Sequence, residues 1–79
     1  MTVTVLLFAS YAESLGTSSL TLELPEGARI EDALSNVRAR SASALPLKPL
    51  VAVNQVYARV TDALRTGDEL AIIPPVAGG

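Results

Sequence analysis

The feature that most constrains this chain is a single amphipathic helix near the middle of 79 residues. Ile30, Ala33, Leu34 and Val37 are spaced i, i+3, i+4 and i+7, which places them on one stripe of a helix. The stripe must be buried, and a chain of this length supplies only one core. Arg29 stands where Ser, Thr or Asp would cap the helix, so we expect some fraying at that end.

The segments on both sides of this helix have the alternation and the β-branched residues of strands. Strands are expected at residues 2–8, 19–24, 50–53, 56–60 and 69–73, with a tight hairpin turn at Asn54 and Gln55. A short helix over residues 9–15 follows the first strand and ends at Gly16. Strands before and after one helix must share a sheet that covers its stripe. The sequence therefore predicts an α+β domain over residues 1–73, a mixed sheet of about five strands wrapped around one main helix, as in a ubiquitin-like β-grasp.

Composition excludes most enzyme active sites. The chain has no cysteine and no histidine, so it has no thiol nucleophile, no Ser-His-Asp triad and no usual ligands for zinc, and we expect no metal site. The carboxylate pairs Glu31/Asp32 and Asp68/Glu69 consist of adjacent residues, whose side chains diverge. The better interpretation of Glu31/Asp32 is a partner for the helix dipole, and that of Asp68/Glu69 is a turn.

The charge balance argues against nucleic acid as a partner. Eight acidic and six basic residues give a net charge of −2, and the basic residues form no stripe. The apolar run at residues 5–9 has no basic residue before it and is too short for a signal or membrane helix. We expect no membrane association and a cytoplasmic location.

Alternation in the first and last strands makes both of their faces apolar. If one set of side chains faces the helix, Leu6, Phe8, Ala71 and Ile73 point to the opposite side of the sheet. An apolar cluster on two neighbouring strands indicates a partner surface. The alternative is that the loop at residues 41–49 covers this face within the chain.

The last six residues, 74–79, contain no charged side chain. Pro74 and Pro75 end the strand and favour a stiff extended backbone, so the tail is expected to leave the sheet and to reach about 20 Å from it. Gly78 and Gly79 lack Cβ atoms, so a narrow channel of another protein can close around them. The alternative is a frayed terminus, although frayed ends are usually polar.

These segments resemble the small, sulfur-carrying subunits of molybdopterin synthase, the MoaD type, along the whole chain. The resemblance rests on residues 3–9 (VTVLLFA), 13–16 (ESLG), 51–55 (VAVNQ), 64–69 (LRTGDE) and 74–79 (PPVAGG). The Pro-Pro-Val-x-Gly-Gly ending is the most specific of these, because it separates this subfamily from most other ubiquitin-like carriers.

The resemblance implies that the chemistry lies on the carboxylate of Gly79, with no cofactor bound to the chain and no catalysis by the chain alone. A ubiquitin-activating-like enzyme would adenylate Gly79 with ATP, and a sulfur donor protein would displace AMP to leave a thiocarboxylate. The large catalytic subunit of molybdopterin synthase would receive the tail and pass its sulfur to cyclic pyranopterin monophosphate, in molybdenum cofactor biosynthesis. The expected assembly is a heterotetramer with two copies of each subunit.

The resemblance, together with the alternation of the strands, gives the remaining site residues. The arm inserted into the large subunit comprises Pro74, Pro75, Val76, Ala77 and Gly78. The docking face comprises Leu6, Phe8, Ala71 and Ile73. Three alternatives stay open: a sulfur carrier for thiamine thiazole or tRNA thiolation, a protein modifier conjugated to lysines, and a ubiquitin-like interaction module with an inert tail.

Overall fold

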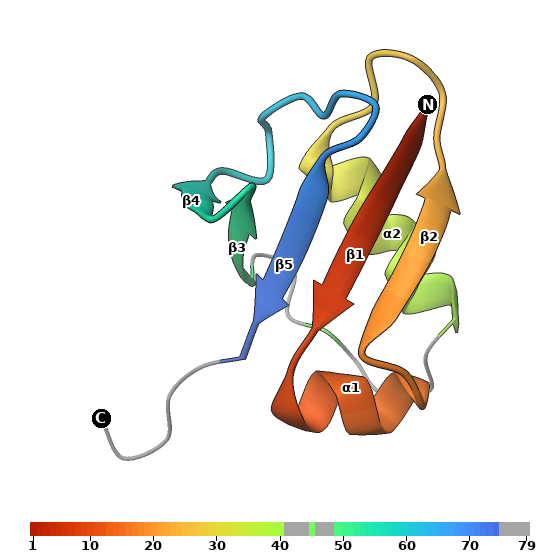
Figure 1. The fold of residues 1–79 in the computed structure, drawn as a ribbon, viewed down its shortest axis with the longest axis vertical. Helices are drawn as coiled ribbons and strands as arrows, with labels where there is room; N and C mark the ends of the chain where they lie inside the picture. The colour runs from red at the N-terminus through yellow and green to blue at the C-terminus, as the bar shows by residue number, and fades with distance from the viewer. Residues whose placement is uncertain (41–44, 46–48, 75–79) are drawn as a thin grey trace.

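The fold is built on a mixed β-sheet (Figure 1). The computed structural model describes residues 1–40, 45 and 49–74 of the chain. The strand order is β2-β1-β5-β3-β4. The central pair β1 and β5 is parallel, and the other neighbouring pairs are antiparallel. The elements are β1 (Thr2–Leu7), α1 (Ala9–Leu15), β2 (Ser19–Glu23), α2 (Ile30–Arg40), β3 (Leu50–Val53), β4 (Val56–Ala58) and β5 (Glu69–Ile73). This architecture confirms the expected β-grasp.

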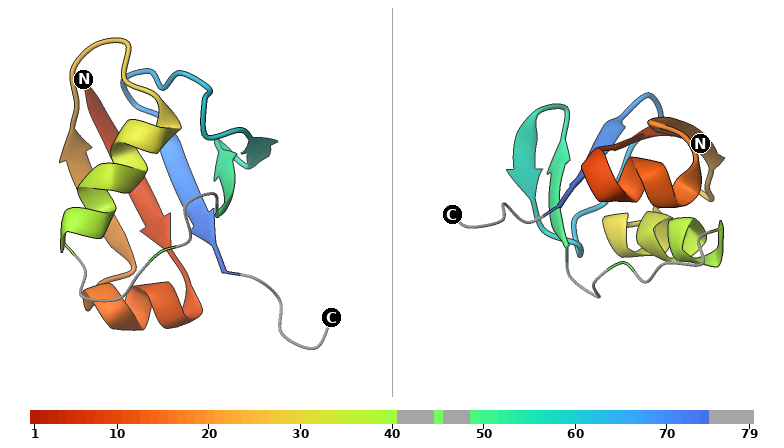
Figure 2. Two further views of the ribbon diagram at one scale, coloured as in Figure 1. Left: turned by 180° about the vertical axis from the view of Figure 1, so that it is seen from behind. Right: turned by 90° about the horizontal axis from the view of Figure 1, so that it is seen from below.

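The core lies between one face of the sheet and α2, which lies behind the strands in Figure 1 and in front of them in the left view of Figure 2. The stripe that predicted this helix is fully buried. It packs in one cluster with the inward-facing residues of the sheet, which include Val3, Val5, Leu70 and Ile72. Leu45, from the connection between α2 and β3, belongs to the same cluster and therefore packs on the helix side of the sheet. No helix within the described part of the chain is long and apolar enough to span a membrane.

The start of α2 differs from the expectation of fraying. The main-chain N–H of Ile30 donates to the carbonyl oxygen of Asp62 (3.0 Å), and that of Glu31 donates to the carbonyl oxygen of Val60 (2.8 Å). The first main-chain N–H groups of the helix, which a capping side chain would normally accept, are therefore paired with the segment after β4. The expectation was wrong because this contact joins residues far apart in the sequence.

All three aspartates of the chain follow an arginine by three residues, and each closes a turn in the same way. Each carboxylate accepts the main-chain N–H of its arginine, at 2.8 Å for Asp32, 3.0 Å for Asp62 and 2.8 Å for Asp68. The main-chain N–H of each aspartate also donates to the carbonyl oxygen of the same arginine. The aspartates therefore act as turn residues, as the sequence indicated for Asp68.

The hairpin between β3 and β4 turns at Asn54 and Gln55, which have φ values of 51° and 72°. Two successive residues at positive φ form the turn that matches the twist of a β-hairpin. The Asn54 side chain accepts the main-chain N–H of Glu69 (3.0 Å) and donates to the Asp68 carboxylate (3.0 Å). Asn54 thereby fixes the hairpin to the beginning of β5.

Three strands are shorter than the sequence predicted, and β2 is one of them, since it ends at Glu23. β1 ends at Leu7, because Phe8 becomes the residue that precedes α1, with φ −127° and ψ 153°. β4 ends at Ala58, because Arg59 and Asp62 form a turn, and carbonyl oxygens of this turn accept the first N–H groups of α2. The ends of β1 and β4 thus lie where the backbone enters a helix or a turn.

Candidate functional site

The four residues predicted for the docking face belong to β1, to β5 or to the residue that follows β1, on the side of the sheet away from α2. In the parallel pair, Leu6 lies opposite Ala71. Leu6, Ala71 and Ile73 are half-buried, and Phe8 is 46% exposed. The neighbouring residues Leu7, Leu70 and Ile72 are buried in the core, as alternation requires.

Three of the four residues line one shallow pocket of about 420 Å³. The lining residues are Phe8, Ala52, Gln55, Tyr57, Ala71 and Ile73. Leu6 is the exception: it lies beside Ala71 in the sheet but does not line the pocket. Among the described residues that line it, none carries a charged side chain, and the polar side-chain groups are the Gln55 amide and the Tyr57 hydroxyl.

Sequence reasoning missed the contribution of the hairpin to this surface. Ala52 lies directly opposite Ala71 on one side and opposite Tyr57 on the other. Leu50 lies opposite Ile73 and is 50% exposed, while Tyr57 is 72% exposed. Alternation about the inward-facing Val51 puts Leu50 and Ala52 on the outer face, where Ala52 is nevertheless only 6% exposed, and only the sheet order places both beside β5.

The opposite edge of the same sheet face is polar. The outward residues of β2 are Ser19, Thr21 and Glu23, which lie opposite Leu6, Thr4 and Thr2 of β1. Thr4 in turn lies opposite Glu69 of β5. The apolar surface is therefore confined to the part of the face formed by β5, β3 and β4 and by the end of β1.

The apolar surface and the root of the tail lie at the same end of the sheet. Because β1 and β5 run parallel, Phe8 and Pro74 follow the ends of neighbouring strands that point the same way (Figure 1). Pro74 is half-buried directly after Ile73. The other predicted tail residues, Pro75, Val76, Ala77, Gly78 and Gly79, lie outside the described residues.

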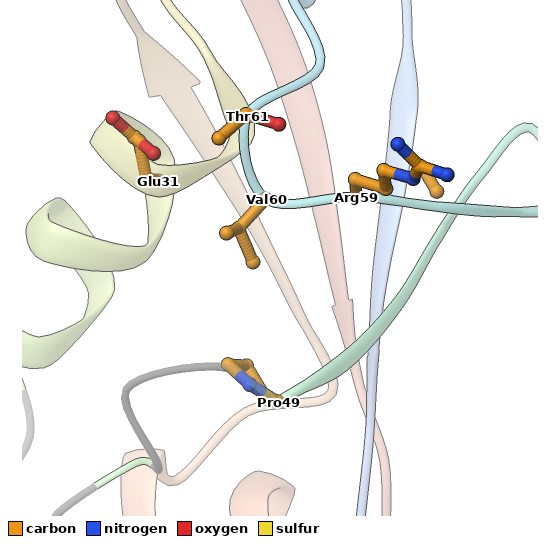
Figure 3. A pocket seen from close by; sticks show the side chains of 6 residues that line it. Glu31, Pro49, Arg59, Val60 and Thr61 are labelled. Atoms are coloured by element: carbon orange, nitrogen blue, oxygen red, sulfur yellow. The ribbon is translucent and has the colours of Figure 1, made fainter.

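A second pocket, also of about 420 Å³, lies between the first turn of α2 and the segment after β4 (Figure 3). It is lined by Glu31, Pro49, Ala58, Arg59, Val60 and Thr61. The guanidinium of Arg59 points away from the carboxylate of Glu31 in Figure 3, so the two charges do not converge on one ligand position. Among the residues that the structure describes, no group of three or more acidic, cysteine or histidine side chains could hold a metal ion.

The chain is 45% identical to the molybdopterin synthase sulfur carrier subunit of Chlamydomonas reinhardtii, with all of both chains covered. It is 33% identical to the subunit of the same name from Homo sapiens, over 98% of this chain and 93% of that one.

Among solved structures, SAMP1 from Haloferax volcanii matches with a TM-score of 0.85 and 28% identity, over 100% of both chains. The BexX/CysO complex of Amycolatopsis orientalis matches with a TM-score of 0.71 and 25% identity, over 98% of this chain and 99% of that one. The ThiS family matches residues 5–79, which is nearly the whole chain. On this match and on the full-length identity to sulfur carrier subunits, the chain belongs to the ThiS family.

Proposed function

We propose that this chain is the sulfur carrier subunit of molybdopterin synthase and that the group which carries the sulfur is the C-terminal carboxylate of Gly79. The observation that carries the proposal is the 45% identity, over the full length of both chains, to a molybdopterin synthase sulfur carrier subunit. The Gly-Gly ending and the lack of cysteine support a main-chain end as the reactive group, since the chain has no thiol to hold sulfur.

The proposed chemistry needs only a carboxylate from this chain. A C-terminal carboxylate is ionised at neutral pH and attacks the α-phosphate of ATP, which gives an acyl adenylate and releases pyrophosphate. Hydrosulfide supplied by a sulfur donor then attacks the acyl carbon and displaces AMP, and loss of the hydrosulfide proton leaves a thiocarboxylate. The sequence has no phosphate-binding glycine-rich loop, so an activating enzyme must supply the nucleotide site and the cationic groups.

The remaining residues act by placing that carboxylate. Partner proteins bind the β-grasp domain, residues 1–73, through the docking face of Leu6, Phe8, Ala71 and Ile73. Residues 74–79 form the arm that enters the active site of the large catalytic subunit, where Gly78 passes a narrow channel. When a partner is bound next to the start of the tail, the tail can place its sulfur only within a small volume. The effective concentration of the sulfur at the substrate is therefore raised.

Reconstitution tests this proposal. The chain bearing a C-terminal thiocarboxylate is mixed with the large catalytic subunit from the same organism and with cyclic pyranopterin monophosphate. The expected product is molybdopterin with its dithiolene, and two carrier chains are consumed for each product. The unmodified carboxylate form is the control and should give no product. Consumption of sulfur by a thiazole or tRNA acceptor, with no dithiolene formed, would assign the chain to another pathway.

A second candidate function is protein modification. The observation in its favour is the TM-score of 0.85 with SAMP1, and a structure of that protein is described as a small archaeal modifier protein. A modifier forms an isopeptide bond between its terminal glycine and a lysine of another protein. Peptides that carry the Gly-Gly remnant on lysine, found by mass spectrometry of cell extracts, would support this second function.

A further inference from the structure

The hydrophobic core holds the β3–β4 hairpin by few side chains. Of the residues in β3 and β4, all of which the structure describes, only Val51 belongs to the buried core cluster. β4 is three residues long, pairs with β3 alone and forms one edge of the sheet. Both strands lie to one side of α2 in the two views of Figure 2. A short hairpin that buries little apolar surface is marginally stable and opens more readily than the rest of a domain.

Asn54, at the turn of this hairpin, connects it to the start of β5 through three polar groups. Its main-chain N–H donates to the carbonyl oxygen of Glu69 (2.9 Å), and its side-chain oxygen accepts the main-chain N–H of Glu69 (3.0 Å). Its side-chain N–H donates to the Asp68 carboxylate (3.0 Å). The paired register of β3 and β5 ends at Val53 and Leu70, so the Asn54 contacts begin where the strand pairing stops. They hold the turn of the hairpin against β5.

The hairpin and the strands beside it present exposed apolar side chains on one face of the sheet. Phe8 and Ile73 come from the ends of β1 and β5, and both of these strands contribute side chains to the core cluster. Leu50 and Tyr57 come from the hairpin and are 50% and 72% exposed. A partner that contacts both groups needs them in a fixed relative position, because a surface that must be ordered on binding costs affinity.

We propose that Asn54 is a positioning residue for docking, and that its side chain keeps Leu50 and Tyr57 in place beside the docking face. This inference rests on the proposed function, in which the large catalytic subunit binds that face. Asn54 lies next to Glu69 at the start of β5, whereas the tail follows the end of that strand. Loss of the Asn54 contacts therefore weakens docking and leaves the chemistry at Gly79 unchanged.

Two variants separate this role from a general contribution to stability. Asn54→Gly tolerates the positive φ of the turn and removes both side-chain hydrogen bonds. Thr66→Ala is the control, because it removes an exposed side-chain oxygen that accepts the main-chain N–H of Thr2 (3.0 Å), a bond that does not involve the hairpin. Each variant should lower the unfolding temperature by about 5 °C.

Hydrogen exchange in the free chain measures the opening of the hairpin without a partner. In the unchanged chain, the amides of β3 and β4 should exchange faster than the buried amides of α2. Asn54→Gly should accelerate exchange in β3 and β4 by about tenfold, and Thr66→Ala should leave it within about twofold. Hairpin amides that exchange together with those of α2 in every variant would overturn the inference.

The synthase reaction measures the effect on docking. The thiocarboxylated chain is the varied substrate for the large catalytic subunit of the same organism. Asn54→Gly should raise its KM by about threefold or more and leave kcat within about twofold, because the docked tail reacts as before. Thr66→Ala should change neither value. An unchanged KM in Asn54→Gly, or a loss confined to kcat, would overturn the inference.

Asn54→Asp is a second variant in case the glycine variant does not fold. It keeps an acceptor for the main-chain N–H of Glu69 and tolerates the turn, but it sets a second carboxylate against that of Asp68. Exchange in the hairpin and KM should change in the same direction as in Asn54→Gly, and no change in either would contradict the proposal. If the unchanged chain yields no dithiolene, the proposed function has failed, and the exchange data still decide whether Asn54 holds the hairpin closed.

Discussion

Phe8 shows how one residue serves both the fold and the proposed site. Its carbonyl oxygen accepts the main-chain N–H groups of Tyr11 (3.0 Å) and Ala12 (3.4 Å), which begins α1. Its side chain makes no capping hydrogen bond, and it lines the outer pocket with 46% of its surface exposed. The backbone of Phe8 therefore serves the helix, while its ring is available to a partner.

This division leads to a prediction for Phe8→Asp. An aspartate before the first turn of a helix accepts main-chain N–H groups and stabilises the helix by about 1 kcal/mol, which offsets the loss of a half-exposed ring. The free energy of unfolding, measured with urea, should therefore change by less than about 1 kcal/mol. Affinity for the large catalytic subunit should fall by about tenfold or more, because a charge enters an apolar contact.

Phe8→Leu is the matched control, since it keeps the position apolar. It should retain most of the affinity. A large loss of stability in Phe8→Asp would contradict the account, since it would show that the ring belongs to the core.

The elements of secondary structure were largely predictable, because each depends on local pattern. The stripe of α2 and the alternation of β1 and β5 placed these elements within a residue of their observed bounds. The start of α2 was not predictable, because its first N–H groups are paired with carbonyl oxygens of residues 60 and 62. No pattern within the helix reports a contact with a segment about thirty residues away.

Asp32 contributes the local part of that helix start. Its carboxylate accepts the main-chain N–H of Arg29 at 2.8 Å, which is one half of a capping box. Asp32→Ala should lower the free energy of unfolding by about 0.5–1.5 kcal/mol, measured by urea denaturation. Asp32→Asn keeps an acceptor oxygen and should lose less. Equal stability of the alanine variant and the unchanged chain would show that the contacts from residues 60 and 62 suffice alone.

At the scale of the whole molecule, the parallel pairing of β1 with β5 brings the apolar pocket and the root of the tail to one end of the sheet. Alternation alone predicted that Leu6, Phe8, Ala71 and Ile73 share a face. It did not reveal Ala52, Gln55 and Tyr57, because the position of the hairpin beside β5 follows from the sheet order. The tail was identified by its composition, which needs no knowledge of the fold.

In the proposed function Gly79 carries the sulfur and the β-grasp domain supports it. The most direct measurement is intact-protein mass spectrometry after incubation with the activating enzyme, ATP and a sulfide source. The mass of the unchanged chain should rise by the exchange of one oxygen for one sulfur. The chain that lacks Gly79 should unfold at the same temperature and keep its mass. Sulfur incorporation into the truncated chain, or none into the unchanged chain, would contradict the claim.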